Sequence, residues 1–412
     1  MHDASRARPC ARLHAIVSSN SRPPFVALGA FYFFYFAVIG GFMPYWGLYL
    51  QSLGFNAEAI GELMAVVMAT RIIAPNFWGY IADSTGQRLR LVRIGAFMIC
   101  IGWLGVFVAR EFWPLAAVLL AYGFFQNAIL AQFEAVTMAH LGPQRERYSQ
   151  VRVWGSLGFI VTGTGLGLAF DYYDVAMLPL ALLACAVATW LASLFVPDIA
   201  TPTRHEADSN VWQLLSQTPV WSFFLAHFLL QLSHAPYYTF YSIFLEEHGY
   251  SRTHIGWLWG VGVLAEVAMF IVMHKFLPWV GEQRLMLISL LLAALRWVLI
   301  GQFVDSVVVI WLAQLLHAAS FATFHAAAMT RIYRYFGDGN QGQGQAIYSM
   351  LWGTGVALGS WWVGMLWASD SGPWIFTAAA GLCLLAFLIL HYGARRNRPS
   401  ALPRTLAPTV SA

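Results

Sequence analysis

The chain of 412 residues is 59% apolar and 10% charged, with a mean hydropathy of +0.61. Soluble domains carry about 25% charged residues, so this composition excludes a soluble globular protein and indicates an integral membrane protein. The net charge of +4 does not indicate a nucleic-acid partner, because the basic residues are spread between apolar segments.

Apolar stretches follow one another along the chain from residue 25 onward. A membrane-spanning helix needs about 20 consecutive, mostly apolar residues. With that length as the criterion, the sequence predicts an all-α integral membrane protein with 12 transmembrane helices in two six-helix bundles. The predicted helices are 25–50, 58–82, 91–109, 113–138, 149–170 and 175–196, then 219–245, 254–277, 284–302, 306–330, 345–368 and 372–393.

One long polar stretch, PDIATPTRHEADSNVW, separates the sixth and seventh predicted helices and is typical of a soluble linker. The expected divisions are an N-terminal arm (1–24), a first bundle (25–196), a linker (197–218), a second bundle (219–393) and a tail (394–412). The arm is rich in Arg and Ser and lacks an apolar core, so it is not a secretory signal peptide. We expect a disordered cytoplasmic arm, and an upstream start codon is the alternative origin.

Basic residues are concentrated on one side of the predicted membrane. Of the 23 Lys and Arg residues, 18 lie in the arm, the linker, the tail or the loops after the even-numbered helices, and only Arg110 and Arg252 lie on the opposite side. Because cytoplasmic loops are enriched in Lys and Arg, both termini and the linker are predicted to be cytoplasmic. The expected location is a bacterial inner membrane, crossed several times.

The two halves of the chain resemble each other weakly. LGFNAEAIGEL (53–63) aligns with HGYSRTHIGWL (248–258) at an offset of 195, and the same offset places Arg71 opposite Glu266. Internal symmetry between two helical halves is typical of secondary transporters, whose substrate site lies near the middle of the membrane between the halves. The sequence therefore predicts a transporter with a central site.

The turn after the second predicted helix reads GYIADSTGQRLR (79–90). Its Gly79, Asp83, Gly86 and Arg88 resemble the conserved cytoplasmic loop of the major facilitator superfamily. That resemblance implies an Asp–Arg latch that stabilises the outward-facing state. The alternative is a simple turn with cytoplasmic arginines.

Glu266 lies in the apolar stretch WLWGVGVLAEVAMFIVM (257–273). A carboxylate at the centre of a membrane helix costs about 2.5–3.5 kcal/mol on translocon scales, so such groups usually have a function or a partner. We expect Glu266 to exchange a proton, since a partly desolvated glutamate can do so near neutral pH. The alternative is a structural link to an arginine of another helix.

Further ionisable residues lie inside the predicted helices, and their order resembles the arrangement in lactose permease. The resemblance implies a substrate-binding pair, Glu134 and Arg152, and a proton-coupling cluster, Glu266, Arg296, His317 and His325.

His317 and His325 are eight residues apart, which is about 12 Å along an α-helix and on adjacent faces. Both titrate in a suitable range, although a packing role is the alternative for each alone. Lactose permease has a further carboxylate one turn after its histidine, where this chain has Ser320 and Phe321. Which group carries the proton therefore stays open.

A closer resemblance extends over 25–393. The segments 234–267, 151–156, 295–297 and 314–329 are similar to the 3-phenylpropionate transporter family, a branch related to oligosaccharide and nucleoside proton symporters. This resemblance implies proton symport of a small aromatic acid.

Four more residues are candidates for contact with the substrate. Arg71 keeps its charge at any pH and can hold a carboxylate through two hydrogen bonds. Tyr237 and Tyr238 can stack on an aromatic ring, and His234 lies on the same helix. Helix packing is the alternative role of these aromatic side chains.

Together these features predict a secondary active transporter, not an enzyme, that imports a small aromatic carboxylate such as 3-phenylpropionate or cinnamate by alternating access. The proton gradient is the expected energy source, with no cofactor and no metal. A proton symporter for a sugar or a nucleoside is the alternative. A membrane enzyme or sensor is disfavoured, because the sequence has no HExxH motif, no paired cysteines and no added soluble domain. The expected partners are a small-molecule substrate, a proton and the lipid bilayer, but no nucleic acid, and the chain is expected to function as a monomer.

Overall fold

The computed structural model describes residues 23–199, 211–368 and 370–396, and all regular elements in these ranges are helical. Residues 1–22 of the predicted arm, 200–210 of the linker and 397–412 of the tail lie outside the described residues. The described part of the linker contains a short helix, α7 (Val211–Leu215).

Six long helices make up the first half of the chain: α1 (Phe25–Ser52), α2 (Ala57–Thr85), α3 (Arg88–Leu104), α4 (Phe112–Leu141), α5 (Tyr148–Phe170) and α6 (Leu178–Leu194). The second half contains α8 (Thr218–Glu247), α9 (Arg252–Val280), α10 (Glu282–Gln302), α11 (Val307–Leu315), α12 (Phe324–Leu366) and α13 (Gly372–Arg396). Short 3₁₀ turns lie at Gly105–Phe107 (η1), Gly142–Arg147 (η2) and Val175–Met177 (η3), and a π-helix lies at Ala319–Thr323 (η4).

The second half also makes six passes, because α11, η4 and the start of α12 form one pass and the rest of α12 forms the next. The chain turns between them at Gly337, whose φ of 63° is in the left-handed region that favours glycine. The sequence predicted a loop over 331–344, but the structure is helical there except at this turn. A glycine turn between two helical ends is invisible to a search for apolar stretches.

By length and apolarity alone, eight segments of the described chain can cross a membrane, and one of them contains both α4 and α5. The helices α2 and α8 and the second pass of α12 are not among them. These three helices pack against one another between the halves, where polar side chains do not face lipid. Their lower apolarity therefore reflects their central position.

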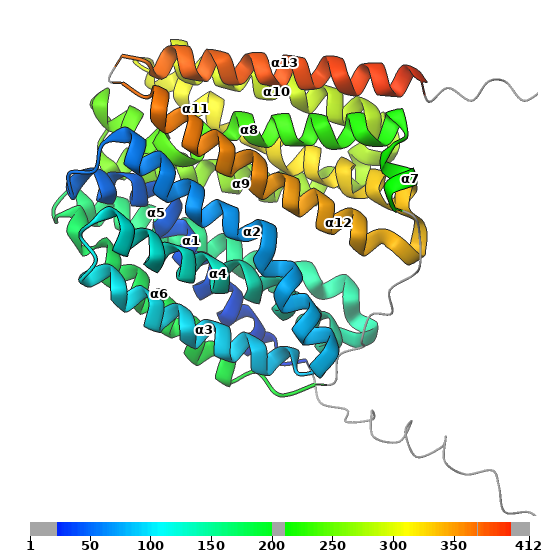
Figure 1. Cartoon of the computed structure of the whole chain (residues 1–412), viewed down its shortest axis with the longest axis horizontal. Helices are drawn as coiled ribbons and strands as arrows, with labels where there is room; N and C mark the ends of the chain where they lie inside the picture. The colour runs from blue at the N-terminus through cyan, green and yellow to red at the C-terminus, as the bar shows by residue number, and fades with distance from the viewer. Residues whose placement is uncertain (1–22, 200–210, 369, 397–412) are drawn as a thin grey trace, which may run out of the picture.

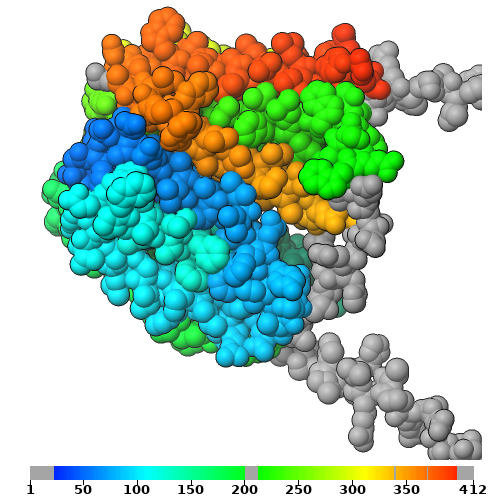
Figure 2. Space-filling view, viewed as in Figure 1, coloured from blue at the N-terminus to red at the C-terminus, as the bar shows by residue number. Residues whose placement is uncertain are grey.

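The two halves form separate bundles that meet along α2 and α12, along α5 and α9, and along α1 and α8 (Figure 1). Figure 2 shows α2 and α12 in contact on the visible face. We call the end of the molecule where α6 ends and α8 begins the linker end, and the opposite end the far end. The closest contacts between the halves lie toward the far end. There, a Cβ added to Gly61 would lie 2.5 Å from the Ser360 carbonyl oxygen, and one on Gly256 would lie 2.5 Å from that of Gly163.

The loop after α5 closes the far end through Asp171. Its carboxylate accepts hydrogen bonds from the backbone N–H groups of Arg252 (2.8 Å) and Thr253 (3.2 Å) at the start of α9. The Tyr45 hydroxyl of α1 adds a second contact between the halves, at 3.3 Å from the Arg252 carbonyl oxygen of α9. Partial burial by itself raises the pKa of the Asp171 carboxyl, but the hydrogen bonds from Thr253 and Arg252 outweigh it and hold the pKa below its ordinary value. A carboxylate of the first half therefore caps a helix of the second half.

We expect Asp171→Asn to open the far end more often, because the charge at the α9 N-terminus is lost. Since the pKa is lowered in the closed state, the carboxylate stabilises that state above its ordinary pKa, and this stabilisation is lost as the pH falls through the lowered pKa. Spin labels at Gln51 and Phe303 measure the opening by double electron–electron resonance. The wild type should show longer distances only below about pH 4, and the variant already at neutral pH.

The control is Asp174→Asn, since Asp174 lies in the same loop but accepts a hydrogen bond from Ala176 of its own half (2.8 Å). Equal distance distributions in both variants would show that Asp171 does not hold the far end closed.

At the linker end, the turn 79–90 forms the pair that the resemblance implies. Gly86 ends α2 with a φ of 67°, and Arg88 makes an ion pair with Asp83. Arg88 also donates to the Gln132 side chain (2.5 Å), which joins α2, α3 and α4. A Cβ on Gly79 would lie 3.9 Å from the Gln132 amide nitrogen, so this glycine faces the same network.

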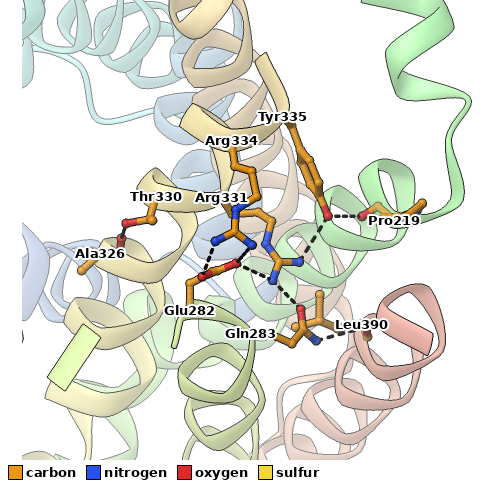
Figure 3. A network of polar contacts seen from close by, with 9 residues as sticks. All are labelled: Pro219, Glu282, Gln283, Ala326, Thr330, Arg331, Arg334, Tyr335 and Leu390. Atoms are coloured by element: carbon orange, nitrogen blue, oxygen red, sulfur yellow. Dashed lines mark hydrogen bonds and ion pairs between the residues drawn. The ribbon is translucent and has the colours of Figure 1, made fainter. Parts of the chain in front are cut away.

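The second half has a different network at this end, built around Glu282 (Figure 3). Arg331 and Arg334 of α12 approach its carboxylate to 3.2 and 2.5 Å. Arg331 also donates to Gln283 (2.6 Å), and Tyr335 donates to the Pro219 carbonyl (3.0 Å). Glu282 is 8% and Arg331 is 6% exposed, so a buried ion pair joins α10 and α12, and the Tyr335 hydrogen bond adds α8 to the cluster.

Glu282→Ala should lower the free energy of unfolding by about 3–5 kcal/mol, because it leaves the Arg331 guanidinium buried without a counter-charge. Thermal unfolding in detergent measures the change as a lower Tm. The matched control is Asp198→Ala, which removes the partner of Arg93 at 3.4 Å on the surface and should cost about 0–1 kcal/mol. A Tm equal to that of the control would contradict a stabilising role for the Glu282 network.

Candidate functional site

A cavity of about 580 Å³ lies between the two halves. Its wall combines residues of α1, α2, α4 and α5 with residues of α8, α9, η4 and α12. This volume suits a small molecule. Among the residues that the structure describes, no group of three or more His, Cys, Asp or Glu side chains could hold a metal ion.

Most of the residues that the sequence singled out meet in this cavity. Its wall contains Arg71, Glu134, Arg152, Tyr238, Glu266, His317 and His325. The structure therefore brings together ionisable groups from both halves that are up to 254 residues apart in sequence (Arg71 to His325).

Three predicted residues lie behind the wall instead. His234 is fully buried, bonded through Nδ1 to the Leu230 carbonyl (2.8 Å). Tyr237 is 1% exposed and donates to Gln314 (3.2 Å). Arg296 is fully buried as well. In this conformation the structure does not support direct contact of these three with a ligand in the cavity.

The His317 imidazole lies between the Glu266 carboxylate and the Arg296 guanidinium and contacts both. The His317 Nε2 is 2.5 Å from a Glu266 carboxylate oxygen, and its Nδ1 is 2.9 Å from an Arg296 nitrogen. A guanidinium can only donate hydrogen bonds, so Nδ1 must accept and the proton of the neutral imidazole must be on Nε2. His317 therefore donates to Glu266.

Arg296 is held in place by several contacts. It donates to Gln314 (3.2 Å) and Ser320 (3.4 Å), and its guanidinium carbon lies 4.2 Å from the centre of the Tyr237 ring. No carboxylate of the described residues lies within 4.0 Å of its nitrogens, so Arg296 acts on Glu266 through His317.

The π-helix η4 lies between His317 and His325. A π-turn adds one residue to the helical turn, and this brings two side chains eight positions apart closer to one helix face than an α-helix would. The Phe321 ring stacks between the two imidazoles, with ring centres 5.7 and 6.3 Å away. His325 also lies 3.3 Å from the Tyr348 hydroxyl. Both histidines thus face the cavity, and their imidazoles stack on the two sides of the Phe321 ring.

The first half contributes cations that lie against aromatic rings. Arg71 lies 4.1 Å from the Trp352 ring centre, and Arg152 lies 4.0 Å from that of Phe36. Glu134 accepts a hydrogen bond from the Tyr148 hydroxyl (3.2 Å) and makes no ion pair with Arg152 within 4.0 Å. The pair that the resemblance implies is therefore not in direct contact here.

Several residues of the wall are not among the predicted site residues: Tyr35, Phe36, Gln231, Trp259, Tyr348 and Trp352. Trp352 had a usable signal, because it lies in LWGTGV (351–356), the counterpart of VWGSLG (153–158) in the first half. The others are uncharged, so the cost of placing a charge in a membrane helix, which marked Arg71 and Glu266, does not mark them.

Several known proteins are similar to this chain in fold or in sequence. The model of the MFS_1 like family matches residues 25–378. The probable 3-phenylpropionic acid transporter of Escherichia coli is 29% identical over 74% of this chain and 81% of that protein. The maltose permease of Geobacillus stearothermophilus is 28% identical over 65% of this chain and 68% of that protein.

Among solved structures, the nucleoside transporter NupG superposes with a TM-score of 0.78 at 17% identity, over 90% of this chain and 99% of that chain. The predicted fold, two six-helix bundles of the major facilitator kind, is confirmed. The chain belongs to the MFS_1 like family and is a multi-pass membrane transporter of the major facilitator superfamily, not an enzyme.

Proposed function

We propose that this protein is a proton-coupled symporter that imports a small aromatic carboxylate of the 3-phenylpropionate or cinnamate kind. The distribution of arginines supports a cytoplasmic linker end. With that orientation the contacts at the far end close the outer side, and the cavity belongs to an inward-facing state. The Asp83–Arg88 pair lies on the cytoplasmic side of this arrangement and joins helices of the first half only, so its role as a latch of the outward-facing state stays a prediction.

The observation that carries the proposal is the charge in and directly behind the cavity wall. Three arginines, Arg71, Arg152 and Arg296, face only two glutamates, Glu134 and Glu266. A surplus of buried positive charge favours an anionic ligand, because a guanidinium without a counter-charge is costly in a membrane. A carboxylate also suits guanidinium geometry, and the aromatic wall suits a ring.

Glu266 is the proposed proton carrier. Arg296 holds His317 as the neutral Nε2–H tautomer, since a second proton on Nδ1 would point at a guanidinium that has only donors. The imidazole can then orient Glu266 but cannot easily take up its proton. To His325, which lies 3.3 Å from the Tyr348 hydroxyl, we assign the transfer of the proton from the cavity toward the linker end.

A sugar or nucleoside proton symporter is the second candidate. The similarity to a maltose permease and to the NupG fold favours it, as does the Glu134–Tyr148 hydrogen bond, which suits the recognition of hydroxyl groups. Neutral substrates would leave the surplus of positive charge without an explanation.

Purified protein in proteoliposomes should accumulate labelled 3-phenylpropionate or cinnamate when the outside is acidic, and a protonophore should abolish the accumulation. Maltose and uridine tested in parallel decide between the two candidates. Gradient-driven uptake of maltose or uridine without any uptake of aromatic acids would overturn the proposal.

Glu266→Gln should abolish accumulation against a gradient while exchange of labelled for unlabelled substrate continues, because the amide cannot release a proton. The two modes are measured in the same liposomes. Glu58→Gln, an exposed residue in the first turn of α2, is the control and should keep both. Accumulation by the Glu266 variant at the control's level would refute the coupling role.

A further inference from the structure

The three arginines of the site differ in their counter-charges. Arg296 reaches Glu266 through His317. Arg152 interacts electrostatically with Glu134, although the two make no direct ion pair. Arg71 makes no ion pair within 4.0 Å among the described residues, and the groups that interact with it electrostatically are the tyrosines Tyr35, Tyr122 and Tyr238, which are neutral at physiological pH. Among the described residues, Arg71 is thus the cavity arginine that no carboxylate compensates.

An uncompensated guanidinium in the middle of a membrane helix needs a reason. The Trp352 ring, 4.1 Å from the Arg71 guanidinium carbon, offers a cation–π contact of about 0.5–2 kcal/mol. That is less than the several kcal/mol that removing an ion from water costs. Arg71 lines the cavity and makes no hydrogen bond within the described residues, so its donors are available to a ligand.

The contact between Arg71 and Trp352 depends on a glycine. A Cβ added to Gly353 would lie 2.9 Å from the Arg71 Cβ and 3.2 Å from the Met68 carbonyl oxygen. The glycine therefore lets α12 of the second half approach α2 of the first half. Trp352 also lies near Tyr238, with ring centres 6.0 Å apart, and both rings line the cavity.

We propose that Arg71, rather than Arg152, binds the carboxylate of the substrate, and that Trp352 and Tyr238 hold its aromatic ring. This assignment rests on the proposed transport of an aromatic acid. The first half then binds the carboxylate of the ligand, and the second half binds its ring. One bound molecule bridges the α2–α12 contact, and the distance between carboxylate and ring becomes a determinant of specificity.

The test compares an acid with its neutral analogue. Binding of 3-phenylpropionate and of 3-phenylpropionamide is measured by titration calorimetry on the full-length protein and on Arg71→Gln, Arg71→Lys and Arg152→Gln. We expect Arg71→Gln to weaken binding of the acid about tenfold or more, with little change for the amide. Arg71→Lys should lie between, since it keeps the charge but not the planar fork.

Trp352 is tested in the same way with ligands of different length. Trp352→Phe keeps a ring and should retain the order of affinities among phenylacetate, 3-phenylpropionate and 4-phenylbutyrate. Trp352→Leu should make the three affinities nearly equal.

Equal losses of affinity for the acid and the amide in Arg71→Gln would indicate a structural role of Arg71 and overturn the assignment. So would loss of acid preference in Arg152→Gln alone. If the wild type binds neither compound, the proposed function itself is wrong. This outcome is distinct from a wrong assignment of Arg71, because it is seen without any variant.

Discussion

A guanidinium that can only donate hydrogen bonds constrains the centre of this transporter. Arg296, buried against Tyr237 and bonded to Gln314, lies 2.9 Å from the Nδ1 of His317. That contact leaves the imidazole proton on Nε2, directed at Glu266 2.5 Å away. The glutamate is thereby oriented and partly compensated without being paired to an arginine directly. The proposed role of Glu266 as proton carrier requires a carboxylate that can change its protonation, which a direct buried ion pair would oppose.

The two halves contribute different ionisable side chains to the site. The second half contains the series of Glu266, His317 and Arg296, whereas the first half presents Arg71 and Arg152 to the cavity with aromatic rings beside them. Under the proposed roles, the first bundle binds the charge of the substrate and the second bundle binds the proton. Close contacts of glycines and the Asp171 carboxylate at the start of α9 hold those bundles together at the far end.

Much of the candidate site could be read from the sequence because charged residues are so costly in apolar helices. Glu266, Arg71 and Arg152 were conspicuous for that reason, and all three line the cavity. Aromatic residues carry no such penalty, so Trp352 was missed and Tyr237 was predicted together with Tyr238. Neighbouring helical positions point about 100° apart, so Tyr238 faces the cavity whereas Tyr237 points to Gln314 behind the wall.

The amino-acid sequence by itself determined the number of membrane passes, the two-half organisation and the set of ionisable residues inside the membrane, because apolar length and charge density are properties of segments. Tertiary structure alone decided how those residues are paired. It placed His317 between Glu266 and Arg296, aligned it with His325 through a π-turn, and left Arg71 without a carboxylate. Pairing depends on how helices distant in sequence pack and rotate, and helices that are apolar on all faces do not encode that rotation in their periodicity.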